Sequence, residues 1–273
     1  MIIQHNMTAM NTNRQLGVTT GNLAKSAEKL SSGYRINRAA DDAAGLSISE
    51  KMRGQIRGLD RASTNAQDGI SLIQTAEGAL NEIHSIIQRM RELSVQAATD
   101  TNVSADRRAI GSELEELRSE ITRIASETEF NTMKLLSGGF GTKNLQVGAN
   151  RSQRIKFHIS DMRADAIGIG RAGYSTVKDF ETATAFISTV NAALSKVSQQ
   201  RSYLGAIQNR LEHTIANADN TAENLQAAES RIRDVDMANQ MVSYSKDNIL
   251  LQASQSMLAQ ANQSSQGVLS ILQ

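Results

Sequence analysis

A glycine-rich segment late in the chain has the spacing of a nucleotide-binding motif. The six residues from Gly168 to Gly173 read G-x-G-x-x-G, which in dinucleotide-binding proteins brings backbone amides against a pyrophosphate. That chemistry requires a strand directly before the glycines, a helix that begins on them, and a surrounding βαβ unit. The pattern that follows contains no parallel strand. We therefore interpret the segment as a flexible connector into the next helix.

Side chains capable of acid–base or metal chemistry are scattered. Glu116 and Glu120 are spaced to follow a helix surface, and the sequence has no G-x-S-x-G nucleophile elbow. The four histidines lie far apart, and none is at metal-ligand spacing from another: His5, His84, His158 and His213. The sequence predicts no enzyme, no cofactor and no metal site.

The composition favours long helices packed on helices. The 273 residues include no Pro, no Cys and no Trp, and aromatic residues make up 3%. An interior Pro would cost a helix about 3 kcal/mol, so its absence suits long uninterrupted helices. A net charge of +1 with mixed signs gives no footprint for nucleic acid, and no run reaches the ~20 apolar residues that membrane insertion requires. Residues 1–6 lack the features of a cleavable signal peptide.

A rod-like helix is predicted from Ala183 to Ile232, because every seventh residue in it is apolar. At 1.5 Å per residue, ~50 residues would extend roughly 75 Å. A companion row three residues later is mixed, with Gln200, Thr214 and Thr221 among its members. Such a seam must be covered by other helices.

Two segments have the pattern of partners for this rod. Residues 66–97 carry two apolar rows at seven-residue spacing, and Ile110 to Thr128 alternate apolar residues at four and three. The short turn between them predicts antiparallel neighbours. A β-hairpin is predicted near residues 144–160, from two short alternating runs, and it should lie on the helices because a lone hairpin is only marginally stable.

The two ends of the chain are predicted to be helical. Leu16, Leu23 and Leu30 recur at seven, the Ser31–Gly33 group breaks that helix, and Asp41 or Asp42 can begin the next. From Gln252 to Gln273 the polar face carries no charge, which is typical of a helix buried among others. The apolar residues of this last segment include Leu250, Leu251, Met257, Leu258, Val268, Leu269 and Leu272.

Several long motifs follow one another along the chain, beginning with L-S-S-G-x-R-I-N-x-A-x-D-D-A-A-G at Leu30–Gly45. Together they resemble bacterial flagellin, whose N-terminal hallmark this first motif matches. One departure is Thr132, where the family usually has Gly after Phe130-Asn131. The other matching segments are Asn65–Ser71, Thr75–Leu80, Gln88–Leu93, Ala228–Ala238, Leu258–Gln263 and Val268–Leu272.

The resemblance implies a structural subunit that polymerises into the flagellar filament for motility. Its fold class would be mainly α, with long antiparallel helices in a coiled-coil bundle formed by paired N- and C-terminal segments, and a small β-hairpin. Residues 1–46 with 235–273 would form the inner core of the filament. Residues 47–234 would form the outer core, with a short connector at 161–178 in place of the variable outer domains of larger members.

The same resemblance implies export, unfolded, through the flagellar secretion channel, so that the protein is secreted into a flagellum. Its partners would be further copies of itself, an export chaperone on the C-terminal helix, and the filament cap and hook-junction proteins. Toll-like receptor 5 of a host is a further expected partner. The positions that match the receptor-contact residues of the family are Gln88, Arg89, Leu93 and Glu113.

Two alternatives remain open at this point. A hook–filament junction protein shares the terminal coiled coils, although the motif at Gln88–Leu93 favours a filament subunit. A soluble helical adaptor, or a protein with membrane-surface helices, belongs to a different class. Membrane-surface helices are usually rich in Lys and Arg, and residues 249–273 contain neither.

Overall fold

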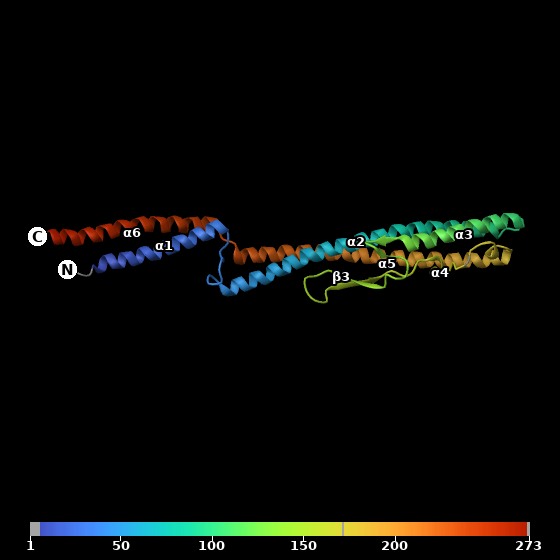
Figure 1. The fold of residues 1–273 in the computed structure, drawn as a ribbon, viewed down its shortest axis with the longest axis horizontal. Coiled ribbons are helices and arrows are strands. Elements are labelled where there is room, and N and C mark those ends of the chain that lie inside the picture. Colours follow the sequence, from blue (N-terminus) through green and yellow to red (C-terminus); the bar gives the residue numbers. More distant parts are fainter. Residues whose placement is uncertain (1–5, 171, 272–273) are drawn as a thin grey trace. The chain divides into compact units, whose positions relative to one another are not determined.

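The computed structural model describes residues 6–170 and 172–271, and these are mainly helical (Figure 1). The chain divides into two compact units, Met1–Gly54 with Glu223–Gln273, and Gln55–Ala222. The α-helices are α1 (Met7–Ser32), α2 (Ala43–Ala97), α3 (Ser104–Glu127), α4 (Ala164–Ile167), α5 (Phe180–Arg233) and α6 (Met237–Ile271). The remaining elements are the strands β1 (Glu129–Phe130), β2 (Met133–Lys134), β3 (Thr142–Gln146) and β4 (Arg154–His158), and the 3-10 turn η1 (Tyr174–Thr176).

Both ends of α1 are closed by local hydrogen bonds. The Asn6 side chain accepts from the Ala9 amide, which satisfies one of the free amides of the first turn. Gly33 takes a left-handed conformation at φ 73°, and its amide donates to the Lys29 carbonyl. This is the usual glycine stop of a helix, so the predicted break at Ser31–Gly33 is confirmed.

The start of α2 is set by two adjacent aspartates. Asp42 Oδ1 accepts from the Gly45 amide at 2.8 Å and caps the helix. Asp41 accepts from the amides of Arg38 and Asn37, and these backbone hydrogen bonds lower the pKa of Asp41. The predicted helix start at Asp41 or Asp42 is confirmed.

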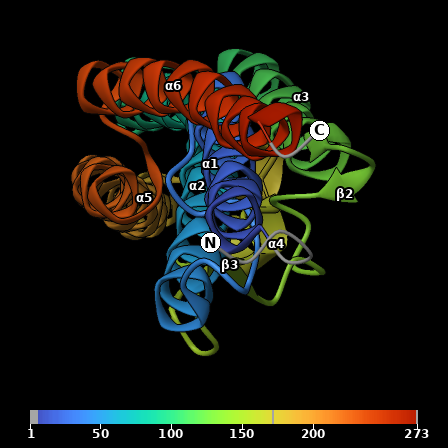
Figure 2. The ribbon, with the colours of Figure 1, turned by 90° about the vertical axis from the view of Figure 1, so that its left-hand side faces the viewer.

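In the first unit, α1 and α6 run side by side and antiparallel (Figure 1). Figure 2 shows the pair from the end where α1 begins and α6 finishes. Asn6 Nδ2 donates to the Ala261 carbonyl at 3.0 Å, and Ser26 Oγ lies 3.4 Å from Asp247 Oδ2, so the two helices meet along most of α1.

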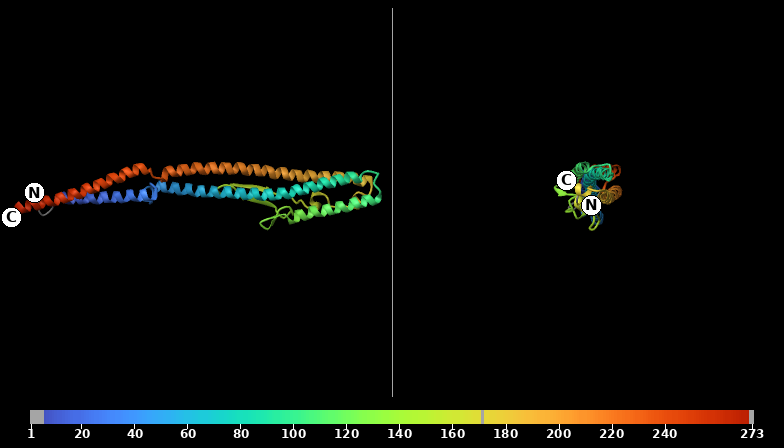
Figure 3. Two further views of the ribbon diagram at one scale, coloured as in Figure 1. Left: turned by 90° about the horizontal axis from the view of Figure 1, so that it is seen from above. Right: turned by 90° about the vertical axis from the view of Figure 1, so that its right-hand side faces the viewer.

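The second unit contains an apolar core, in which the inward-facing side chains of its two main helices are buried. Within this unit α2 and α5 lie side by side (Figure 3). Both predicted rows of residues 66–97 are buried, and so is the main row of α5 from Ala183 to Ala218. Gln200 of the weaker row is also buried, and its amide donates to the His158 carbonyl at 3.3 Å. A buried polar side chain is therefore satisfied by the strand packed above it.

The helix α3 turns back along α2 after residues 98–103, as predicted. Arg107 at its start donates to the Ala97 carbonyl at 3.1 Å, one of the free carbonyls at the end of α2. Ile110, Leu114 and Ile121 are buried against the shared core.

A tight hairpin directly after α3 was not predicted. Glu129 pairs with Lys134 and Phe130 with Met133, so only Asn131 and Thr132 form the turn. Both have positive φ, 48° and 63°, the combination found in a type I′ turn. Asn tolerates this conformation, but a β-branched Thr is strained there. The strands are only two residues long, too short to show an alternating pattern.

The predicted hairpin near residues 144–160 is present as β3 and β4, with Leu145 paired to Ile155 and Thr142 to His158. Ile155 and Phe157 are buried, whereas Leu145 packs against Gly69 of α2 with no room for a side chain at that glycine. Asn65 Nδ2 donates to the Gln146 carbonyl at 3.3 Å. The hairpin lies on the helices, as expected.

The glycine-rich segment is packed rather than flexible, so that part of its interpretation is wrong. The short helix α4 precedes it, Gly168 ends this helix at φ 106°, and Ile169 and Ala172 are buried. The strands among the described residues pair only antiparallel, so the βαβ unit of a dinucleotide site is absent from that part of the chain. The segment is a covering layer over α3.

Candidate assembly surfaces

The α1–α6 pair has an unusually polar interface. Thr19, Ser26 and Asp247 are its most buried side chains besides Ala261. The leucines on the same side are only half-buried: Leu16, Leu23 and Leu30 of α1 with Leu251 and Leu258 of α6. Because half-buried leucines contribute less than fully buried ones, this pair is weakly held in a single chain.

The opposite side of α6 is apolar and exposed. At ~100° per residue, positions 241, 245 and 249 face away from positions 247, 251 and 258. Met241 is 50% exposed, Val242 71% and Ile249 66%, and they border a shallow groove of about 490 Å³ with Leu250. On α1, Met7, Met10 and Val18 are also exposed. We call these exposed apolar side chains of the two helices, which point to more than one side of the pair, the outer face: Met7, Met10, Met237, Met241, Val242, Ile249, Leu250 and Met257.

The predicted assembly residues fall on both sides of α1 and α6. The five leucines named above lie in the seam, whereas Leu250 and Met257 lie on the outer face. The side chains of Val268 and Leu269, and all of Leu272, lie outside the described residues. The outer-face residues Met241, Val242 and Ile249 were missed, although a second apolar row opposite the first was visible in the sequence.

A clasp joins the two linkers that flank the terminal helices. The Arg35 amide donates to the Arg233 carbonyl at 2.7 Å, and the Val235 amide donates to the Gly33 carbonyl at 3.0 Å. The Tyr34 ring lies 4.9 Å from the guanidinium carbon of Arg233 and 6.0 Å from that of Arg53, within cation–π range.

Next to the clasp, α2 and α5 are joined by a partly buried ion pair. Arg53 Nη2 lies 2.8 Å from Glu229 Oε1, with side chains 27% and 12% exposed. A pair this shielded is screened less than a surface pair. It fixes the register of the two helices where the linkers leave them.

The predicted receptor surface contains an ion-pair cluster between α2 and α3. The Arg89 guanidinium lies 3.0 Å from a Glu113 carboxylate oxygen and 3.2 Å from one of Glu92. Both hydrogen bonds raise the pKa of Arg89, and the one to Glu113 has the larger effect. Gln88 is exposed one residue earlier and contacts His84.

Leu93 differs from the other three predicted positions. Its side chain is 2% exposed and belongs to the core. Buried in this way, it cannot touch a partner in this conformation. The spacing of four residues between Arg89 and Leu93 places them on neighbouring turns of α2, but it does not indicate that the core covers the second of them.

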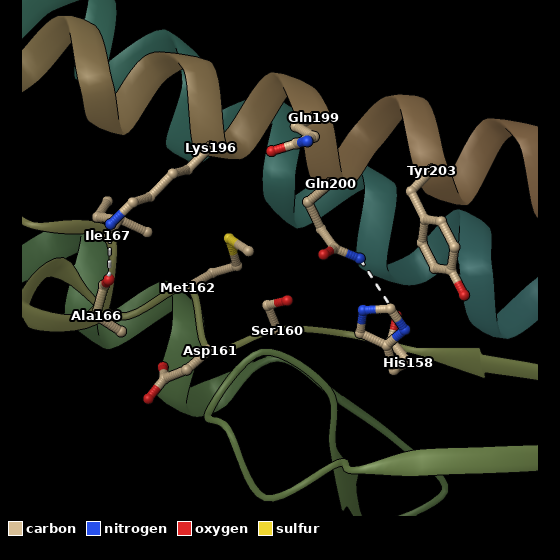
Figure 4. Close-up of a pocket in the computed structure, with 10 residues that line it drawn as sticks. All are labelled: His158, Ser160, Asp161, Met162, Ala166, Ile167, Lys196, Gln199, Gln200 and Tyr203. Atoms are coloured by element: carbon tan, nitrogen blue, oxygen red, sulfur yellow. Dashed lines mark hydrogen bonds between the residues drawn. The ribbon is translucent and has the colours of Figure 1, made fainter.

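A pocket of about 470 Å³ lies between α5 and the segment that follows β4 (Figure 4). Lys196 Nζ donates to the Ala166 carbonyl at 3.3 Å, and the His158 ring packs on Tyr203 at a centroid distance of 4.9 Å. Lys196 and Gln200, whose side chains donate to the carbonyls of Ala166 and His158, therefore hold this segment to α5. The arrangement is that of a packing contact, with no paired nucleophile and base.

The fold and its surfaces define a class of structural protein: a helical subunit with paired terminal helices and an apolar outer face suited to association. In the described ranges, no group of three His, Cys, Asp or Glu side chains is placed to hold a metal ion. None of the helices described has the length and apolar character needed to cross a membrane.

Comparison with known proteins identifies the family. The model of the bacterial flagellin N-terminal helical region matches residues 3–141, and that of the C-terminal helical region matches residues 187–272. The chain is 57% identical to a flagellin of Halalkalibacterium halodurans and 52% identical to flagellin FlaB2 of Treponema pallidum, each over the full length of both chains. A crystal structure of Bacillus cereus flagellin, 30% identical, superposes with a TM-score of 0.51 over 61% of this chain and 94% of that one.

The chain belongs to the bacterial flagellin family. It is a short form of the filament subunit, a structural and non-enzymatic protein that polymerises with itself. The recognition made from the sequence motifs is confirmed.

Proposed function

We propose that subunits join through the terminal helices, with residues 1–46 and 235–273 forming the inner core of the filament and residues 47–234 the outer core. The observation that carries this is the outer face. Within it, Met241, Val242, Ile249 and Leu250 line one shallow groove, and an exposed apolar patch of this kind usually marks an interaction site. Further support comes from the division of the chain at Gly54 and Glu223, close to these limits.

The test is a charge placed on the outer face. Ile249→Asp should leave the second unit folded but abolish filament growth, since each subunit interface would bury an unpaired carboxylate. Val103→Asp is the matched control, because Val103 is 61% exposed and precedes α3, where an acidic residue is favourable. Electron microscopy and circular dichroism give the two readouts. Normal filaments from Ile249→Asp would contradict the proposal.

The second part of the proposal is that the subunit is exported, and the exposed apolar side chains of the outer face support it. An apolar outer face must be kept from premature association inside the cell, and residues 252–273 carry no charge that would do this. The proposed route is unfolded passage through the flagellar secretion channel, with a chaperone on α6 until release. The filament cap and the hook-junction proteins would then be neighbours of the first and last subunits, and the protein would be found in the flagellum outside the cytoplasm.

Recognition by Toll-like receptor 5 is the second proposed interaction, and the exposed cluster of Gln88, Arg89 and Glu113 is its candidate contact. Arg89→Ala should lower receptor-dependent signalling at least tenfold. Arg123→Ala is the matched control, because both arginines are paired with glutamates and their side chains are 52% and 54% exposed. Reporter cells with and without the receptor provide the measurement, and equal loss in both variants would count against the site.

A further inference from the structure

The methionines whose side chains are described differ in exposure between the core of the second unit and the terminal helices. Met90 is 0% and Met162 4% exposed, and both belong to the core of the second unit. Five others lie on the outer face at 48–66% exposure: Met7, Met10, Met237, Met241 and Met257. Among methionines whose side chains are described, one more, Met133 of β2, is exposed, at 37%.

Thioether sulfur is the site at which this chain is most open to two-electron oxidation. The sequence contains no Cys and no Trp, so no thiol competes for an oxidant. A peroxide transfers one oxygen atom to the sulfur lone pair. The S=O bond forms and the O–O bond breaks. The second oxygen of the peroxide leaves as water, after it takes up the proton of the transferred oxygen. The product, methionine sulfoxide, is polar. Methionine sulfoxide reductases, with a dithiol as the electron donor, reduce it to methionine and water.

We infer that the five outer-face methionines form a reversible, oxidant-sensitive site that controls assembly of the free subunit. Reaction with a peroxide makes these exposed apolar side chains of α1 and α6 polar. S=O groups buried between subunits then lack hydrogen-bond partners. The oxidised subunit adds to a growing filament poorly. Once assembled, the same sulfurs are covered and resist oxidation. This inference rests on the proposed assembly through the outer face.

The experiment uses purified full-length subunit and dilute hydrogen peroxide. Peptide mass spectrometry should find sulfoxide at the five positions and at Met133, with Met90 unmodified. Seeded elongation, followed by light scattering, should slow at least tenfold after oxidation. It should recover after treatment with methionine sulfoxide reductases and dithiothreitol as their electron donor. Preformed filaments should show slower modification of the five positions than free subunits, while Met133 serves as the internal reference.

Two variants separate the site from general damage. The fivefold change M7L, M10L, M237L, M241L and M257L conserves volume and apolar character, and its elongation should be insensitive to peroxide. Met133→Leu should remain as sensitive as the parent. If the fivefold variant does not assemble, loss and repair of elongation in the parent chain still decide the question.

The outcomes of this experiment are distinguishable from failure of the proposed function. Two outcomes count against assembly through the outer face. In one, the unoxidised parent subunit does not elongate seeds; in the other, the Ile249→Asp variant elongates them normally. Unoxidised subunits that elongate, together with oxidised subunits that elongate equally fast, overturn the oxidation inference alone.

Discussion

Gly111 of α3 lies directly against the backbone of Tyr174. A Cβ atom on Gly111 would be 2.5 Å from the Tyr174 amide nitrogen and 2.7 Å from its Cα, both closer than real contacts allow. The Tyr174 ring lies beside Arg108 of the same helix, at 5.4 Å from the guanidinium carbon to the ring centroid. This glycine therefore sets how closely the connector between β4 and α5 can cover α3.

We expect Gly111→Ala to destabilise the second unit, because the obstructing atoms are backbone and cannot rotate away. The loss should be about 1–3 kcal/mol, the usual range for overpacking. Gly78→Ala is the matched control, since a Cβ at this position in α2 meets nothing within 4 Å and Ala is the better helix former by about 1 kcal/mol. Urea unfolding measures both changes. A stabilising effect of both substitutions would show that the connector is not held where the structure has it.

Thr132 offers the opposite change. We expect Thr132→Gly to stabilise the β1–β2 turn by roughly 1 kcal/mol, because a non-glycine residue in the left-handed region pays about 1–2 kcal/mol and glycine returns part of this as chain entropy. Asn131→Gly is the control and should change stability less, since Asn tolerates this conformation. A lower urea midpoint for Thr132→Gly than for the parent would contradict the strain at this residue.

Stability below pH 4 should depend on Asp161. The Arg163 side chain, whose Nη2 lies 2.6 Å from Asp161 Oδ2, and the Arg163 amide lower the pKa of this carboxyl from its ordinary value of 3.8. A depressed pKa means that the contribution to the free energy of unfolding is complete above pH 3.8 and is lost as the pH falls through the folded-state pKa.

Asp161→Asn should therefore lower stability at pH 7 by about 1–2 kcal/mol and flatten the acid limb below pH 3.8. Hydrogen bonds to charged groups usually contribute about 1.5–3 kcal/mol, and solvent reduces this value because the Arg163 side chain is 48% exposed. Arg163→Gln removes the partner and should flatten the same limb. Thermal unfolding across pH 2–7 provides the comparison. If stability falls with decreasing pH in both variants as it does in the parent, Asp161 does not contribute to the acid dependence.

The terminal helices should be less protected than the core in a dilute subunit. The α1–α6 seam has half-buried leucines and a buried Ser26–Asp247 contact, whereas Ile73, Leu80 and Ile87 of α2 are completely buried. Hydrogen exchange should therefore be fast along α1 and α6 and slow along residues 73–93. In filaments α1 and α6 should become as slow as α2. Equal protection in the dilute subunit would show that the seam is sufficient by itself.

The sequence alone determined the helices, the position of the β3–β4 hairpin and the family. Heptad rows such as Ala66–Ile87 report burial directly, because a row repeated at seven must face a partner helix. The Ser31–Gly33 break and the Asp42 cap are local signals, and local hydrogen bonds decide them.

The tertiary structure decided what non-local contacts impose. Leu93 lies one turn from Arg89 on α2, and only the packing of the other elements around α2 buries Leu93 in the shared core while Arg89 stays exposed. Glycines weaken local preference, so the glycine-rich segment was predicted to be flexible, yet Ile169 and Ala172 are buried and Gly173 and Tyr174 lie against Gly111 of α3. The division of α6 into a seam and an outer face likewise follows from where α1 lies, since both sides of that helix are apolar in sequence.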